Sequence, residues 1–383
     1  MTTIPEQLDA TVANALDPIL DAALADGRLA GGVALVAKGG KLVYARAAGL
    51  ADIEHKRPMA RDAIFLAASL TKPIVTAAFL SLVEDGVMGM DDPITKYLPT
   101  FTPEFEGKKA QITLRQMLTH TSGLSYGFLQ PADGPYLRLG VSDGLNEPGR
   151  SFADNLALIV EAGLFFPPGA AWLYSVSMDV LGAAMEAATG KTLPQVVNER
   201  VATKLGMDDS GFAITDRARL ATHYADGPPP VPMGDDFVFP FADLSGIRFT
   251  PGRIFDQTSF PSGGGGMACS APDLLTFLEA IRTGGAPIVK AETAKAMMTN
   301  QTGSHALPLN GPGWGFGFGG AVLLDPTPTA SRLPVGTWTW GGVYGHSWAV
   351  DPATETSFVL MTNTTVEGMA GALSVDLMAA ALA

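Results

Sequence analysis

A serine and a lysine spaced three residues apart, Ser69 and Lys72, are the side chains of this sequence best suited to joint chemistry. They lie in residues 67–72, ahead of an apolar run at 73–83 that predicts a helix. Residues three apart share one helical face, so the two side chains would project side by side. An unprotonated lysine amine within hydrogen-bond distance of a serine hydroxyl can accept its proton and activate it as a nucleophile. The spacing is common by chance, so the prediction of covalent catalysis depends on the rest of the chain.

Tyr174 is a second candidate for proton transfer. It follows a Pro-Gly loop at 166–169 and precedes a helix predicted to begin near Ser177. A tyrosine at such a junction can place its phenol in a cleft, and a cationic neighbour such as Lys72 would lower its pKa from about 10. Its oxygen would then shuttle a proton between nucleophile and leaving group. The alternative interpretation is a half-buried ring with its hydroxyl in water.

The segment 340–347 is rich in glycine and leads from one predicted strand to the next. Glycines at a strand end let a ligand approach the backbone closely. A backbone N–H in this segment, together with the N–H of Ser69, would then form an oxyanion hole. His346 would line the same site. A glycine-rich turn without a ligand is the alternative interpretation.

Other motifs of the chain predict no separate chemistry. The segment 123–127 matches the Gly-x-Ser-x-Gly elbow of α/β-hydrolases, but that elbow needs a strand before its serine, Ser125, and a helix is predicted there. The glycine run 263–266 lacks the spacing of a nucleotide-binding loop, so no cofactor is expected. The histidines lack metal-ligand spacing, so no metal is expected, and His120 is interpreted as structural. The single cysteine, Cys269, is expected to be packed and inert.

The composition favours a compact globular enzyme. Of 383 residues, 47% are hydrophobic and 16% are charged, which suits a substantial core. The net charge of −13, from 38 acidic and 25 basic residues, disfavours nucleic acids and anionic membranes as partners. The N-terminus shows neither the basic region nor the apolar segment of a secretory signal, and no apolar run has the length of a bilayer span. We therefore expect a cytoplasmic protein without a membrane partner.

The order of the predicted elements favours an α+β fold. Strand patterns occur near both chain ends, at 32–37, 41–46, 313–318, 336–340, 347–350 and 357–361. Helical patterns lie at 5–26, from Ser69 to near Gly86, and at 111–118, 152–164, 176–189, 193–205, 272–283 and 370–382. This order predicts one antiparallel sheet built from both termini and interrupted by a helical insertion. We expect an α/β sandwich of residues 1–85 and 265–383, and a helical, loop-rich region of residues 86–264. Within that region, the irregular, aromatic-rich segment 226–266 is expected to cover or line a site.

Five motifs together resemble those of the serine β-lactamase-like superfamily. They are Ser69-Leu70-Thr71-Lys72, Leu118-Thr119-His120-Thr121-Ser122-Gly123-Leu124, Tyr174-Ser175-Val176, Gly263-Gly264-Gly265-Gly266-Met267 and Trp340-Gly341-Gly342. Their order and approximate spacing match the superfamily over nearly the whole chain. The sequence is similar to family VIII carboxylesterases, the branch related to class C β-lactamases and DD-peptidases. The resemblance implies the β-lactamase/DD-peptidase fold, with the active site between an α/β sandwich and an all-helical region.

The resemblance also implies roles for individual residues. Ser69 would be the acylated nucleophile, Lys72 its base, and Tyr174 the tyrosine that shares the proton transfer. The N–H groups of Ser69 and Val343 would form the oxyanion hole. With the glycine-rich segment included, the expected substrate-binding residues are Tyr126, Trp340, Gly341, Gly342 and His346.

Two departures from the β-lactamase pattern favour an ester substrate. Val176 replaces the asparagine of Tyr-x-Asn, which would hold a substrate amide, and Trp340 replaces the lysine that would hold a substrate carboxylate. Loss of such partners weakens discrimination in favour of polar substrates. We therefore expect a serine hydrolase that cleaves small carboxylic esters with short or medium acyl chains. The alternatives are an acyltransferase that passes the acyl group to an alcohol, a weak β-lactamase or D-peptidase, and a catalytically silent scaffold.

Overall fold

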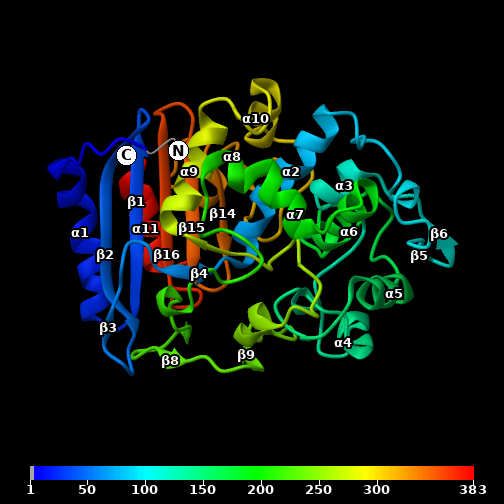
Figure 1. The fold of residues 1–383 in the computed structure, drawn as a ribbon, viewed down its shortest axis with the longest axis horizontal. Helices are drawn as coiled ribbons and strands as arrows, with labels where there is room; N and C mark the ends of the chain where they lie inside the picture. Colours follow the sequence, from blue (N-terminus) through cyan, green and yellow to red (C-terminus); the bar gives the residue numbers. More distant parts are fainter. Residues whose placement is uncertain (1–3) are drawn as a thin grey trace.

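The computed structural model describes residues 4–383. Its main sheet is antiparallel and is built from both chain ends (Figure 1). The strand order is β12-β13-β14-β15-β16-β1-β2-β3. The N-terminal strands are β1 (Gly31–Lys38), β2 (Lys41–Asp52) and β3 (Arg57–Pro58). The C-terminal strands are β12 (Trp314–Phe316), β13 (Ala321–Leu323), β14 (Trp338–Gly342), β15 (His346–Asp351) and β16 (Thr356–Thr362). The predicted hairpin and the predicted pairing of the two termini are confirmed, because β1 pairs with both β2 and β16.

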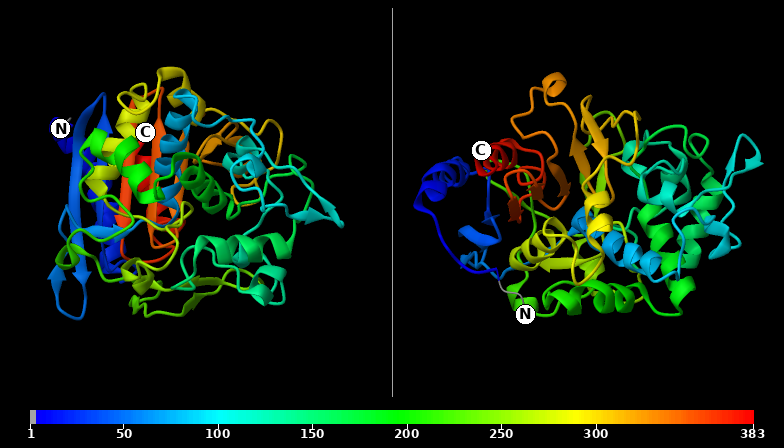
Figure 2. Two further views of the ribbon diagram at one scale, coloured as in Figure 1. Left: turned by 45° about the vertical axis from the view of Figure 1, so that its right-hand side comes forward. Right: turned by 90° about the horizontal axis from the view of Figure 1, so that it is seen from above.

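Both faces of the sheet are buried, and side chains of β1 alternate between two cores. Val33 and Leu35 face one core, and Ala34 and Val36 face the other. Helices α1 (Ala10–Ala25) and α11 (Ala372–Ala381) lie side by side over the second face (Figure 2). Helix α9 (Ala271–Arg282) packs against β1 and β16 on the first. Two-sided burial explains why β1 reads as a continuous apolar run rather than an alternating one.

The helix that follows Ser69 is buried on all sides. Helix α2 (Thr71–Glu84) has twelve consecutive buried residues, from Thr71 to Leu82. A helix that is apolar around its whole circumference belongs inside a protein. It passes between the sheet and the helical part of the molecule, and contacts α6 (Ser177–Thr189) and α7 (Leu193–Val197). Its N-terminal end is thereby held rigidly at the junction of the two.

The residues between α2 and α9 form short helices and small sheets. The helices are α3 (Leu114–Leu118), α4 (Pro135–Leu139), α5 (Phe152–Ala162), α6, α7 and α8 (Thr203–Leu205). The short strands are β5 (Glu104–Phe105), β6 (Lys108–Lys109), β7 (Tyr224–Ala225), β8 (Val231–Pro232), β9 (Phe237–Phe239) and β10 (Ile247–Phe249). A π-helical turn at Asn198–Ala202 joins α7 to α8, so the predicted helix over 193–205 is continuous. A reciprocal capping box of Thr113 and Gln116 starts α3, as the nearby threonine indicated.

Several local predictions were wrong. The first helix begins at Ala10 rather than near residue 5, because Glu6 bridges to β2 and Asp9 caps the helix. Ser270 precedes α9, but its side chain makes no capping bond. The loop predicted at 130–150 contains α4, and the sequence patterns missed β13 and α10 (Ala291–Met297). Such elements of three to seven residues are too short to show a clear periodicity. Across residues 4–383, no helix has both the length and the apolarity to cross a membrane.

Candidate active site

Ser69 lies where the chain turns from a short strand into α2. Strand β4 (Ile64–Leu66) pairs with β11 (Ala268–Ser270), and the Ala67 N–H donates to the Met267 carbonyl at 2.8 Å. A 3-10 turn over Ala68–Leu70 then leads into the helix. Ala68 has a φ of 45°, a left-handed conformation that residues other than glycine rarely adopt. This strained turn presents Ser69 at the wall of a cavity.

Lys72 lies directly against Ser69. Its Nζ donates to Ser69 Oγ at 3.0 Å and to the Gly264 carbonyl at 2.6 Å. The side chain is only 1% exposed, and burial lowers the pKa of its amine to about 7, against the opposing effect of the Asp179 and Asp143 carboxylates. Burial disfavours a charge that no ion pair compensates. A large fraction of Lys72 is therefore neutral near pH 7 and able to accept a proton.

Tyr174 contacts Ser69 from the opposite side. Its hydroxyl donates to Ser69 Oγ at 2.7 Å and accepts a hydrogen bond from the indole Nε1 of Trp340 at 3.1 Å. Burial raises the pKa of the Tyr174 phenol, and the hydrogen bonds with Ser69 and Trp340 offset this only in part. The predicted lowering of this pKa was therefore wrong. Tyr174 is a protonated phenol at neutral pH, and thus a proton donor.

Aromatic packing holds Tyr174 in place. The His120 ring lies 4.9 Å from the Tyr174 ring, between centroids, and its Nδ1 is 3.1 Å from Ser175 Oγ. His120 comes just after α3, as predicted for a structural histidine at a helix end, and burial holds its pKa well below the usual value. The Tyr174 ring also contacts the rings of Tyr126 and Trp340. A neutral histidine in an aromatic cluster acts as part of this wall.

The glycine run 263–266 forms the floor beneath Lys72. Gly264 donates its N–H to Asp179 Oδ1 at 2.9 Å and offers its carbonyl to Lys72. A Cβ at Gly264 would lie 2.8 Å from the Tyr126 hydroxyl, so a larger residue would displace one of the two. Ser262 Oγ also donates to Asp179 Oδ1, at 2.6 Å. Asp179 thus orients Gly264, which in turn orients Lys72. The sequence motif marked this run, but nothing in the sequence indicated Asp179.

A cavity of about 300 Å³ opens above Ser69. Its wall is mostly apolar, and the described residues that form it include no charged side chain. These residues are Ser69, Phe128, Tyr174, Phe241, Ile247, Leu309, Asn310, Thr339, Trp340, Gly341, Val343, Met369, Ala370 and Met378. Strand β14 and the irregular segment 226–266 both contribute to this wall, and the other residues come from helices and loops. The aromatic segment therefore lines the site, as expected, through Phe241. Phe128, Leu309 and Met369 carried no recognisable signal in the sequence.

The predicted substrate-binding residues divide into two groups. Trp340 and Gly341 line the cavity, whereas Tyr126, Gly342 and His346 lie behind its wall. Gly342 is required by packing, since a Cβ there would lie 2.6 Å from the Ala67 carbonyl oxygen.

His346 occupies a structural position instead of the predicted substrate-binding one. It is fully buried, its Nε2 lies 2.8 Å from the Leu66 carbonyl oxygen, and its ring packs edge-on against Phe65. Burial lowers its pKa to about 4, so it carries no charge at neutral pH. Tyr126, which is also nearly buried, stacks on Phe128 and so supports the cavity wall from behind.

The remaining motifs have structural surroundings. Ser125 is buried, its Oγ donates to the Tyr126 carbonyl at 3.0 Å, and the helix α3 precedes it instead of a strand, so the elbow match is accidental. Cys269 is buried, and burial raises its thiol pKa. In the described part of the chain, no group of three or more His, Cys, Asp or Glu is placed to hold a metal ion.

Comparisons with known proteins agree with this architecture. The family model described as Beta-lactamase matches residues 16–383. Esterase EstB from Burkholderia gladioli is 46% identical over 373 residues, which cover 96% of this chain and 94% of EstB. The solved structure of EstCE1, described as a hydrolase with promiscuous acyltransferase activity, has a TM-score of 0.93 at 40% identity, covering 98% and 99% of the two chains. A LovD6 mutant of simvastatin synthase from Aspergillus terreus has a TM-score of 0.74 at 23% identity, covering 98% and 95%, and shares the fold. The chain therefore belongs to the beta-lactamase family.

Proposed function

We propose that this protein is a serine carboxylesterase that works through an acyl-enzyme on Ser69. The observation that carries the proposal is that a neutral amine and a protonated phenol both reach Ser69 Oγ, at 3.0 and 2.7 Å, at the wall of an apolar cavity. A nucleophile with a base and an acid at hydrogen-bond distance is the minimal equipment for acyl transfer. EstB and EstCE1, an esterase and a hydrolase by name, support the same reaction.

In the proposed acylation step, Lys72 accepts the Ser69 proton as Oγ bonds to the ester carbonyl carbon. The tetrahedral intermediate then collapses, and Tyr174 donates its proton to the departing alkoxide. The ammonium of Lys72 then restores the phenol proton, since both side chains lie at hydrogen-bond distance from Ser69 Oγ. In deacylation, neutral Lys72 accepts a proton from a water molecule as the water oxygen bonds to the acyl carbon. The bond to Ser69 Oγ then breaks, Oγ takes the Tyr174 proton, Lys72 returns its proton to Tyr174, and the carboxylic acid leaves. The raised pKa of Tyr174 suits this role, because an alkoxide leaving group needs a weakly acidic donor.

The oxyanion hole is proposed to consist of the N–H groups of Ser69 and Val343. Val343 follows β14 and lines the same cavity as Ser69. Within residues 4–383 its N–H donates to no protein acceptor, so it is available to a substrate oxygen. Two backbone donors directed at the developing charge supply a large share of the barrier reduction in acyl transfer.

The cavity favours esters with an apolar acyl or alcohol group. Its wall contains no cation that would attract the carboxylate of a β-lactam or a peptide, and the Trp340 indole donates to Tyr174 instead. A volume of about 300 Å³ lies at the lower end of small-molecule sites, which suits short and medium acyl chains. β-Lactams and D-peptides are therefore expected to be poor substrates.

Transfer of the acyl group to an alcohol is a second candidate function. It is supported by the EstCE1 description and by the same apolar wall, which would hold an alcohol as readily as water. Measuring the ratio of ester to acid products in the presence of graded alcohol concentrations separates the two activities. A ratio that stays near zero would rule out transfer.

The test of the proposal is a panel of p-nitrophenyl esters from acetyl to dodecanoyl, with wild-type protein, Ser69→Ala and Ser125→Ala. Ser125 is the matched control, because it is a buried serine in a hydrolase-like motif outside the mechanism. We expect short and medium esters to be cleaved by wild type and Ser125→Ala, and by Ser69→Ala at a rate lower by at least about 10³-fold. Equal activity of Ser69→Ala would overturn the mechanism. If the wild type neither cleaves any ester of the panel nor reacts with a serine-directed phosphonate, the catalytically silent scaffold is supported instead. Turnover of a cephalosporin would support the β-lactamase alternative.

A further inference from the structure

A second and larger cavity lies on the other side of the glycine run 263–266. Its volume is about 610 Å³, and it shares no lining residue with the cavity above Ser69. Its walls come from α5, α6, the start of α7 and the segments around residues 212–217 and 253–261. Gly266 lines this second cavity, whereas Gly264 contacts Lys72. The proposed esterase reaction leaves the second cavity unused.

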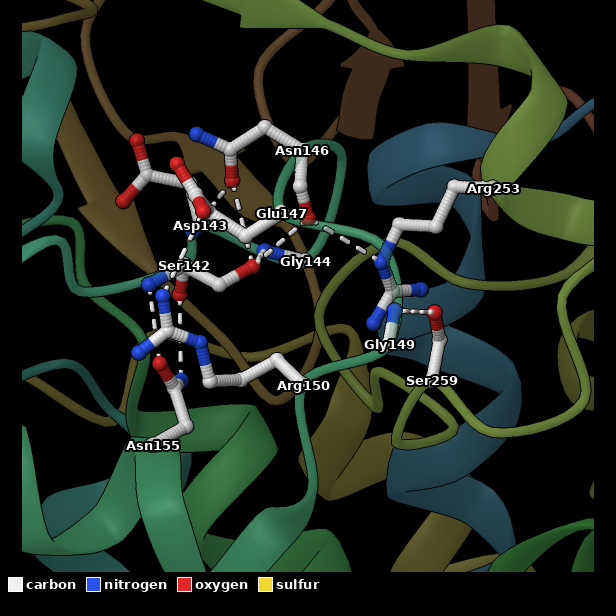
Figure 3. Close-up of polar contacts among 10 residues, drawn as sticks. All are labelled: Ser142, Asp143, Gly144, Asn146, Glu147, Gly149, Arg150, Asn155, Arg253 and Ser259. Atoms are coloured by element: carbon white, nitrogen blue, oxygen red, sulfur yellow. Dashed lines mark hydrogen bonds and ion pairs between the residues drawn. The ribbon is translucent and has the colours of Figure 1, made fainter.

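Arg253 is a buried cation in the wall of this second cavity. It is 7% exposed, and its Nε donates to the Asn146 carbonyl at 3.2 Å (Figure 3). Its Nη2 donates to the Phe260 carbonyl at 2.7 Å. Both acceptors are neutral. Within residues 4–383 its Nη1 has no hydrogen-bond partner and its guanidinium forms no ion pair; Asp179 and Asp256 act on it only at longer range. A buried charge without a counter-charge is costly and calls for an explanation.

A second guanidinium lies at the rim of the cavity. Arg217 stacks on the Phe255 ring, with its Cζ 4.0 Å from the ring centroid, and it too forms no ion pair in the described part of the chain. The two carboxylates of the wall are engaged elsewhere. Asp256 accepts hydrogen bonds from Thr258 and Ser259, and Glu186 accepts the Leu193 N–H at 2.7 Å. Within residues 4–383 the two arginines therefore face the cavity without a direct ion pair, and the carboxylates act on Arg253 only at longer range.

The rest of the wall contains both polar and apolar side chains. Aromatic and aliphatic side chains around the two arginines are Phe152, Phe212, Ile214, Ile254, Phe255 and Phe260. The Arg253 guanidinium itself lies over the Phe260 ring, with the Arg253 Cζ 4.7 Å from the ring centroid. This contact restricts the orientation of the guanidinium plane. Sites for small molecules combine such apolar walls with a few convergent polar groups, and their usual volumes include this one.

The loop beneath Arg253 is held by its own hydrogen bonds. Ser142 Oγ donates to the Asn146 carbonyl at 2.9 Å, and the Asn155 side chain exchanges two hydrogen bonds with the Ser142 backbone (Figure 3). Gly149 N–H donates to Ser259 Oγ at 2.8 Å. These contacts fix the loop without using the charge of Arg253. The charge is therefore unnecessary for the local structure, whose two contacts to Arg253 need only N–H donors.

We propose that this second cavity binds a small monoanion with an apolar body, such as a medium-chain or aromatic carboxylate. The carboxylate accepts hydrogen bonds from the free Nη1 of Arg253, Arg217 closes over it from the rim, and the phenylalanine walls bury the apolar part. Binding is non-covalent and does not rest on the chemistry of Ser69.

The test compares octanoate with 1-octanol as calorimetric probes, since both fill an apolar cavity and only one carries charge. We expect wild type to bind octanoate at least about tenfold more tightly than 1-octanol, as a charge-assisted contact to a buried guanidinium implies. Arg253→Gln keeps N–H donors for the loop but lacks the charge, and is expected to abolish this preference. Ile214→Trp, which narrows the apolar part of the cavity, should weaken octanoate binding and leave p-nitrophenyl acetate turnover unchanged. Arg138→Gln, a surface arginine on α4, is the matched control and should bind octanoate as wild type does.

Three results would overturn the proposal. They are equal affinity for both probes in wild type, an unchanged preference in Arg253→Gln, and an unchanged octanoate affinity in Ile214→Trp. If Arg253→Gln fails to fold, Arg217→Gln replaces it, with an expected loss of at least about threefold in octanoate affinity and none in 1-octanol affinity. A purely structural role of Arg253 would leave the octanoate preference intact. Ester cleavage by Ser69 is measured separately, so failure of either proposal is recognised independently.

Discussion

A buried basic side chain lies near each of the two cavities: Lys72 beside Ser69, and Arg253 in the wall of the second cavity. Lys72 is 1% exposed and Arg253 is 7% exposed, neither forms an ion pair within residues 4–383, and each donates to backbone carbonyls. Burial lowers the pKa of both side chains. For lysine this yields a neutral amine near pH 7, but a guanidinium keeps its proton in any protein environment. One burial environment thus produces a base from lysine and a fixed charge from arginine.

Among the substitutions that test this comparison, Lys72→Arg is expected to reduce catalytic activity the most. The guanidinium would keep its positive charge beside Ser69 and could not accept the serine proton. We expect kcat for p-nitrophenyl esters to fall by at least about 10³-fold, the upper range of a lost general base. Steady-state kinetics with a thermal unfolding control measure this. A variant with more than a tenth of wild-type kcat would show that Lys72 is not the base.

Tyr174→Phe should have the next largest effect. It removes the proton donor to the leaving group but keeps the ring packed against His120 and Trp340. We expect kcat to fall by about 10²-fold or more, and more steeply for alkyl esters than for p-nitrophenyl esters, because a nitrophenolate leaves without protonation. Equal losses for both ester classes would contradict the assignment of Tyr174 as the acid. The comparison needs only matched acyl chains and two leaving groups.

Trp340→Phe is expected to act more weakly. It removes the 3.1 Å hydrogen bond to the Tyr174 hydroxyl and keeps an aromatic cavity wall. A hydrogen bond of net worth about 1 kcal/mol corresponds to a loss of about fivefold in kcat/KM. The variant should bind no carboxylate substrate better than wild type does, since it adds no cation. A gain in cephalosporin turnover would show that Trp340 itself excludes such substrates.

Much of the fold was predictable because its signals are local. The β1–β2 hairpin and the strands β14 to β16 follow from short apolar runs separated by glycines, and Ser69 and Lys72 are only three residues apart. The pairing of the two chain ends followed from element order. The division into a sandwich and a helical region, with its boundaries at 85 and 265, stays a prediction.

What the sequence could not indicate depends on contacts between distant residues. Lys72 and Gly264 are 192 positions apart, and Gly264 and Asp179 are 85 apart, so the support of the lysine appears only after folding. The direction of the Tyr174 pKa shift was wrong for the same reason, since the rings packed around its buried phenol, those of His120, Tyr126 and Trp340, are distant from it in the sequence. Arg253 carried no signal either, because an arginine in a loop is ordinarily exposed.

The finest test of the lysine's position is the pH dependence of kcat/KM in wild type and Asp179→Asn. Activity requires neutral Lys72, so kcat/KM should rise with pH through an apparent pKa of about 7. The Asp179 carboxylate raises the Lys72 pKa, and its removal should therefore shift the rise to lower pH, by about half a unit to one unit. Asparagine keeps an oxygen that can accept the Gly264 N–H, so the loop is retained. A shift to higher pH would contradict the effect on Lys72 assigned to Asp179. The absence of a shift would mean that Asp179 is itself neutral in the resting enzyme, in keeping with the raised pKa that burial gives it. The electrostatic support of Lys72 would then come from Asp143 instead, and Asp143→Asn would produce the shift.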